Sequence, residues 1–236
     1  NSPVQTALTA TNLQLARLLQ LASPTLPVGA YTYSQGLEWA VESGVIRDEA
    51  TAGGWISDLL THGIGRYEAP LVGALMGAWS AGNSGEISRL NAEFMASRES
   101  AELRAETAQM GFSLARLVRD LRDPALVGVE STLSGMSEIG FPTGWSGIAA
   151  VWGINPEDAL VAYLWSWAEN QVLAALKAVP LGQAAGQRLL AELGGKIPAV
   201  AVDALKLPEN LWSNLTPAFA IACARHETQY SRLFRS

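Results

Sequence analysis

The stretch Ser100–Leu121, SAELRAETAQMGFSLARLVRDL, decides the fold class. Its apolar positions recur every three or four residues, which is the period of an α-helix with one buried face. The stretch therefore predicts a long amphipathic helix whose buried face is formed by Leu103, Thr107, Met110, Leu114, Leu117 and Leu121.

The same helical period continues on both sides of this stretch, and no alternating pattern of convincing strand length interrupts it. Capping residues and glycine or proline stops mark the expected ends of the helices. We expect one all-α domain over residues 1–236, a multi-helix bundle of roughly ten helices. The expected helices are 12–22 behind a cap at Thr11 or Asn12, 33–42, one starting at Asp48, 66–79, one after Asn83, 100–121, a short turn at 145–152, 155–179, 180–193, 197–205 and one after Thr216. We expect a loop or a change of helix direction at 135–147.

Composition restricts the function classes. Charged residues are only 16% of the chain, below the roughly 25% of an ordinary globular protein, so we expect a partner to cover some apolar surface. The net charge is −6 and no Lys/Arg block occurs, which argues against a nucleic-acid partner. The longest apolar runs are too short to span a membrane. One cysteine and no signal-peptide pattern predict a soluble cytoplasmic protein.

Catalytic and metal-binding chemistry has few candidates in this chain. The only histidines are His62 and His226, and Cys223 lies three residues before the second one. A thiol, an imidazole and the adjacent Glu227 suggest a nucleophile pair or a nickel site, but no further positioned group follows nearby. We interpret His226 as a partly exposed tail residue and Cys223 as a small apolar residue. No catalytic residue or cofactor is expected, and His226 and Cys223 are only weak metal candidates.

Four segments resemble, in order, the UreF-type urease accessory proteins. The first is Leu19–Glu38, LQLASPTLPVGAYTYSQGLE, and the last is His226–Ser236, HETQYSRLFRS. Between them lie 100–104 with Met110-Gly111, and 179–183 with Gly186-Gln187. One departure is Trp145-Ser146-Gly147, where many members carry a histidine or small residues, so no role is assigned to a histidine there.

The resemblance implies a non-enzymatic, all-helical scaffold. Such a protein dimerises, binds the accessory protein UreD (also called UreH), and through it recruits the GTPase UreG and apo-urease for nickel insertion. Modulation of the UreG GTPase is a further implied role, for which Arg98, Arg104 or Arg232 could serve as an arginine finger. The alternative is a metallochaperone that holds nickel directly through Cys223, His226 and Glu227.

The resemblance also implies which residues contact partners. Tyr31 and Arg232 are the strongest single candidates, since Tyr and Arg dominate interface hot spots. We expect a flexible N-terminus (1–11) and a flexible C-terminal tail (about 225–236), the tail becoming ordered on UreD. A rigid turn at 31–38 and simple fraying of the tail are the alternatives. The expected partner-binding residues are Tyr31, Tyr33, Ser34, Gln35, Glu38, Arg98, Glu102, Arg104, Arg225, His226, Glu227, Tyr230, Arg232, Leu233, Phe234 and Arg235.

Overall fold

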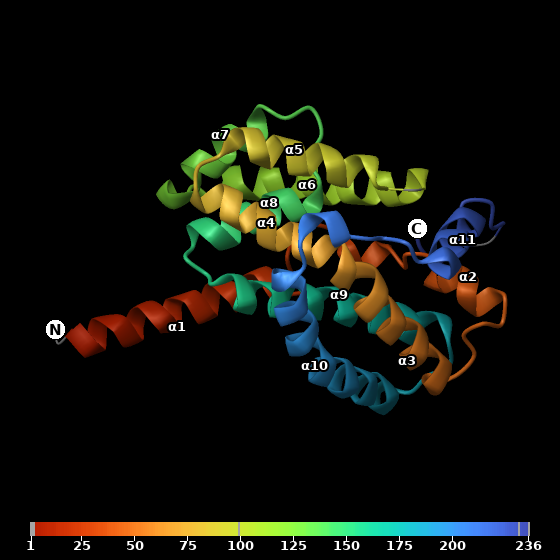
Figure 1. Ribbon diagram of the computed structural model, residues 1–236. Coiled ribbons are helices and arrows are strands. Elements are labelled where there is room, and N and C mark those ends of the chain that lie inside the picture. Colours follow the sequence, from red (N-terminus) through yellow and green to blue (C-terminus); the bar gives the residue numbers. More distant parts are fainter. Residues whose placement is uncertain (1–2, 99, 231, 236) are drawn as a thin grey trace.

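All regular elements of the computed structural model, which describes residues 3–98, 100–230 and 232–235, are helical (Figure 1). The predicted all-α fold is therefore confirmed. Short 3-10 turns η1 (Ala30–Thr32), η3 (Ile64–Arg66), η4 (Pro124–Leu126) and η5 (Glu209–Leu211) and a π-turn η2 (Leu59–Gly63) connect the helices. The α-helices are α1 (Pro3–Ala22), α2 (Leu37–Glu42), α3 (Glu49–Asp58), α4 (Glu68–Ser80), α5 (Ser84–Ala96), α6 (Ala101–Leu121), α7 (Val127–Ser134), α8 (Phe141–Val151), α9 (Pro156–Ala178), α10 (Gln183–Lys206) and α11 (Pro217–His226).

Helices α4 and α8 form the centre of the bundle. Both are apolar on nearly all sides, as expected for helices surrounded by others. Helices α5, α6 and α7 lie on one side of this pair, and α9 and α10 lie on the other (Figure 1). A Cβ at Gly147 would lie 2.8 Å from the Trp79 ring, so a glycine there lets α8 approach α4 closely. Trp79 Nε1 donates to the Thr143 carbonyl at 3.0 Å and fixes the pair.

Several helix ends follow the local signals in the sequence. Asp48, Asn83, Ser100 and Asn155 each accept a hydrogen bond from the backbone N–H three residues later, at 2.8 to 3.1 Å. These bonds satisfy donors that the first turn of a helix leaves unpaired. Gly44 has a φ of 76° and follows the end of α2. The predicted caps at Asp48, Asn83 and Asn155 and this stop are confirmed.

Three predicted boundaries are wrong. Helix α1 begins at Pro3 instead of residue 12, and Figure 1 shows its first turns extending away from the other helices. Helix α2 begins at Leu37 instead of Tyr33, because Gln35 and Gly36 have φ values of 52° and 77° that a helix cannot contain. Helix α8 begins at Phe141, inside the expected loop, because its glycines serve packing against neighbouring helices.

The predicted break at Gly194-Gly195 is also wrong, since α10 is continuous through it. A Cβ at Gly194 would lie 3.2 Å from the Trp165 ring of α9, so the glycine there permits close contact between the two helices. The helix also contains Pro198, which has no backbone N–H and therefore removes one hydrogen bond from α10. Among the described residues, no helix is long and apolar enough to cross a membrane.

Candidate functional site

The C-terminal tail is attached to the body of the protein through His226. This side chain is 0% exposed and lies between Glu38 of α2 and Glu102 of α6. Nδ1 is 2.7 Å from Glu102 Oε2, and Nε2 is 3.2 Å from Glu38 Oε2. Both contacts are hydrogen bonds when both ring nitrogens carry protons, and the positive charge of the imidazolium then partly balances the negative charges of the two carboxylates. The interpretation of His226 as a partly exposed residue is wrong, because α11 packs against α2.

Glu38 also holds the backbone beyond α11. Its Oε1 accepts the N–H of Leu233 at 2.6 Å, and its Oε2 accepts the N–H of Phe234 at 3.0 Å. The Phe234 ring is buried and lies 5.5 Å from the Lys177 ammonium of α9. These charge-assisted bonds to a buried carboxylate fix the course of the chain end.

Glu102 adds the third attachment, from the first turn of α6, where a carboxylate is favourable. Its side chain pairs with Arg232, and its backbone N–H donates to Glu227 Oε1 at 3.2 Å. Glu38, Glu102, His226 and Arg232 therefore form one cluster that joins α2, α6 and the tail. We call these four residues the tail latch.

Three of the predicted residues project from the protein around the latch. Tyr31 is 61% exposed, Leu233 is 72% exposed, and Tyr230 is also fully accessible. The Arg235 N–H donates to the Thr32 carbonyl at 2.8 Å, which places the chain end beside the turn that carries Tyr31. We call Tyr31, Tyr230 and Leu233 the tail surface. Arg225, Glu227 and Arg235 are exposed as well, whereas Ser231 and Ser236 of the quoted motif lie outside the described residues.

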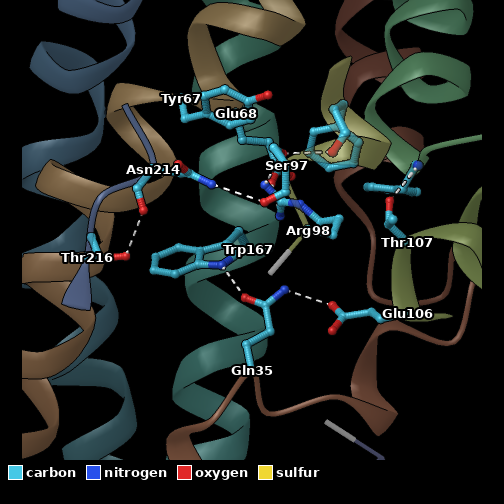
Figure 2. A network of polar contacts seen from close by, with 12 residues as sticks. Gln35, Tyr67, Glu68, Ser97, Arg98, Glu106, Thr107, Trp167, Asn214 and Thr216 are labelled. Atoms are coloured by element: carbon cyan, nitrogen blue, oxygen red, sulfur yellow. Dashed lines mark hydrogen bonds and ion pairs between the residues drawn. The ribbon is translucent and has the colours of Figure 1, made fainter. Parts of the chain in front are cut away.

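The segment after Tyr31 turns into the protein. Tyr33 and Ser34 are buried, and Asn170 of α9 donates to the Tyr33 carbonyl at 3.1 Å. Gln35 bridges two helices in the network of Figure 2: its Nε2 donates to Glu106 at 2.7 Å, and its Oε1 accepts from Trp167 Nε1 at 2.9 Å. In this chain Tyr33, Ser34 and Gln35 thus position the turn and leave Tyr31 as its exposed residue.

Arg98 lies deep in the same network. Its guanidinium stacks over the Phe94 ring at 4.3 Å and pairs with Glu68 at 3.4 Å. The other Glu68 oxygen accepts the Tyr163 hydroxyl at 2.5 Å. Burial, with a smaller effect of Glu68, raises the pKa of Tyr163 well above its ordinary value. This tyrosine therefore stays a neutral donor.

Arg98 and Glu102 are four residues apart in the sequence but pair with other residues, Arg98 with Glu68 and Glu102 with His226 and Arg232. Arg98 precedes the Ser100 cap and so lies outside the helix on which i,i+4 spacing would apply. Arg104 is exposed and pairs with Glu138 at 2.5 Å. Sequence reasoning missed Glu68, Tyr163 and Trp167, for which no local signal exists. Glu106 was detectable, because it follows Leu103 by three residues and so shares the apolar face of α6.

Two clefts adjoin this network. One has a volume of about 120 Å³ and lies between residues 21–31, α6 and α9. The other has a volume of about 60 Å³ and includes residues of the segment after η5. Both are lined by Gln35, Glu68, Arg98, Leu103 and Trp167.

The weak metal candidates are not arranged as a metal site. Cys223 is buried, and its Sγ would lie 3.1 Å from a Cβ placed on Gly36. Both ring nitrogens of His226 face carboxylates of the tail latch. Within the described residues, no group of three or more His, Cys, Asp or Glu side chains could hold a metal ion.

Known proteins resemble this chain over nearly its whole length. A sequence profile of the family described as UreF matches residues 46–194. A urease accessory protein UreF of Dechloromonas aromatica is 76% identical over 96% of this chain and 99% of that protein. Proteins with the same description from Azoarcus sp. and Methylobacillus flagellatus are 60% and 49% identical, over 95% and 94% of this chain and 96% and 97% of their own lengths. The family profile includes Glu102 but ends before the tail.

Proposed function

The chain belongs to the UreF family of urease accessory proteins, and on that premise we propose that it is a non-enzymatic scaffold of urease maturation. In this proposal it binds UreD (UreH) and, with it, recruits the GTPase UreG to apo-urease for nickel insertion. It acts as a homodimer within that complex and modulates the UreG GTPase. Nickel and nucleotide are handled by the partners.

The observation that carries the proposal is the tail surface. Tyr31, Tyr230 and Leu233 are exposed aromatic and aliphatic side chains on segments that the tail latch and the Arg235–Thr32 bond hold in place. Aromatic side chains of this kind are the usual anchors of protein interfaces. A partner that covers them removes apolar area from water, at roughly 25 cal/mol per Å².

The latch reduces the cost of binding. A segment that is disordered before binding must lose its conformational freedom in the complex, which lowers affinity. Here the backbone of Leu233 and Phe234 is already bonded to Glu38. In this proposal the partner meets a tail whose backbone is already bonded to the body of the protein. Whether the tail becomes ordered only on UreD stays a prediction.

Co-purification tests the proposal. A tagged chain is expressed with UreD, UreG and urease, and the recovered proteins and urease activity are compared among the wild type, Tyr31→Ala, Arg232→Ala and a chain lacking residues 225–236. We expect the wild type to recover UreD and UreG, and all three variants to lose UreD and most urease activity.

The matched control is Phe112→Ala, which removes an equally exposed aromatic side chain on α6. It should recover UreD as the wild type does, and thermal unfolding of each variant shows that it is folded. A wild-type chain that recovers neither UreD nor UreG would overturn the proposal. Equal recovery of UreD by Tyr31→Ala and Phe112→Ala would show that the tail surface does not bind UreD.

A further inference from the structure

The larger cleft has a size that fits one side chain. Its volume is about 120 Å³, somewhat below the roughly 150 Å³ of an apolar cavity that accommodates benzene. A nucleotide or a helix is therefore too large for it. Its walls include Leu26, Val28 and Leu173, and Tyr31 stands at its edge. We call this space the loop cleft.

Glu169 of α9 lines the loop cleft and is half-buried. Among the residues that the structure describes, it has no hydrogen-bond or ion-pair partner. Burial raises the pKa of its carboxyl group. A carboxylate that loses water without gaining a partner is unfavourable, so a ligand that supplies a positive charge there is stabilised.

The other charges of the cleft are already paired with one another. Glu68 is bonded to Arg98 and to Tyr163, and Glu106 accepts from Gln35. The lining contains three carboxylates and a single guanidinium, so its formal charge is −2. Both the net charge and the unpaired group thus favour a cation, and the apolar walls favour a cation on a hydrocarbon stem.

We propose that the loop cleft binds one basic side chain, a lysine or arginine, of a partner protein. The stem of that side chain lies against Leu26, Val28 and Leu173, and its charged end pairs with Glu169. Because Tyr31 belongs both to this cleft and to the tail surface, the inference rests on the proposed function. It adds the chemistry that the partner must bring to that surface.

A direct test uses small probes and the full chain. Binding of n-butylammonium, which copies lysine, and n-propylguanidinium, which copies arginine, is measured by NMR titration, with n-butanol as the uncharged comparison. We expect saturable binding of at least one cation to the wild type, weaker binding of n-butanol, and about fivefold or greater weakening in Glu169→Gln. Glu157→Gln is the matched control, an exposed acid on the same helix outside the cleft.

Three results would overturn the inference. They are the absence of saturable binding to the wild type, equal binding to Glu169→Gln and the wild type, and displacement of the probes by equimolar Ni²⁺, which would make a metal ion the occupant.

A parallel co-purification with UreD separates this inference from the proposed function. If the probes bind and their binding depends on Glu169, but the wild type does not recover UreD, then the proposed partner is wrong and the cation site in the loop cleft stands. Undiminished recovery of UreD by Glu169→Gln contradicts the cleft as its docking site.

Discussion

His226 Nδ1 lies 2.7 Å from Glu102 Oε2, and its Nε2 lies 3.2 Å from Glu38 Oε2, so one imidazole joins two helices that begin more than sixty residues apart. The same two carboxylates hold Arg232 and the backbone of Leu233 and Phe234. The position of the tail surface therefore depends on the tail latch, and changes in the latch should affect the tail first.

Replacing His226 should release the tail. The variant His226→Ala leaves Glu38 and Glu102 without the imidazole that both contact, and a buried polar group left without its hydrogen-bond partner typically costs about 1–3 kcal/mol. We expect a lower free energy of unfolding and faster proteolysis after Arg225. His62→Ala, which changes an exposed histidine, is the control and should leave both unchanged. Unaltered proteolysis of His226→Ala would show that the latch does not hold the tail.

Replacing Glu38 by glutamine tests the backbone bonds of the tail. Glu38→Gln keeps the size of the side chain but removes the charge that Leu233 and Phe234 donate to, which should cost about 1–3 kcal/mol. Hydrogen exchange of these two amides should become at least tenfold faster. Glu42→Gln, at an exposed position of the same helix, should leave their exchange rates unchanged.

The buried tyrosine predicts a pH dependence at the alkaline end. Because burial raises the pKa of Tyr163 above its unfolded value, its contribution to stability is complete below about pH 10 and is lost as the pH rises further. The free energy of unfolding should fall more steeply above that pH in the wild type than in Tyr163→Phe. Tyr31→Phe, at the exposed tyrosine, should retain the wild-type profile, and identical profiles for all three chains would contradict this account.

A glycine contact on α6 predicts a large local effect. A Cβ at Gly111 would lie 2.0 Å from the Ile139 carbonyl oxygen, so Gly111→Ala must push α6 away from the segment before α8. We expect a loss of about 2 kcal/mol or more in chemical denaturation. At Gly128 of α7 a Cβ meets nothing within 4 Å, and Gly128→Ala should be neutral or stabilise by up to about 1 kcal/mol. A similar loss at both sites would mean that helix propensity, not contact, decides the result.

The sequence by itself determined most of the helices and several of their ends, although it gave no sign of α7 and divided α10 in two. The apolar period of 100–121 and the caps at Asp48, Asn83 and Asn155 act within a few residues, so each can be recognised without its neighbours in space. The motif of residues 19–38 and the C-terminal motif also pointed to the family. Partner binding by the predicted residues stays a prediction.

Only the tertiary structure decided what the glycines and the charged residues do. Gly194 resembles a helix stop, but it faces Trp165 inside a continuous helix. Glu102 resembles one residue of a solvated helix face, and His226 resembles an exposed tail residue, until α2, α6 and α11 bring them together with Glu38. The physical reason is that caps and apolar periods depend on local backbone geometry, whereas the pairing of buried charges depends on which distant helices share a surface.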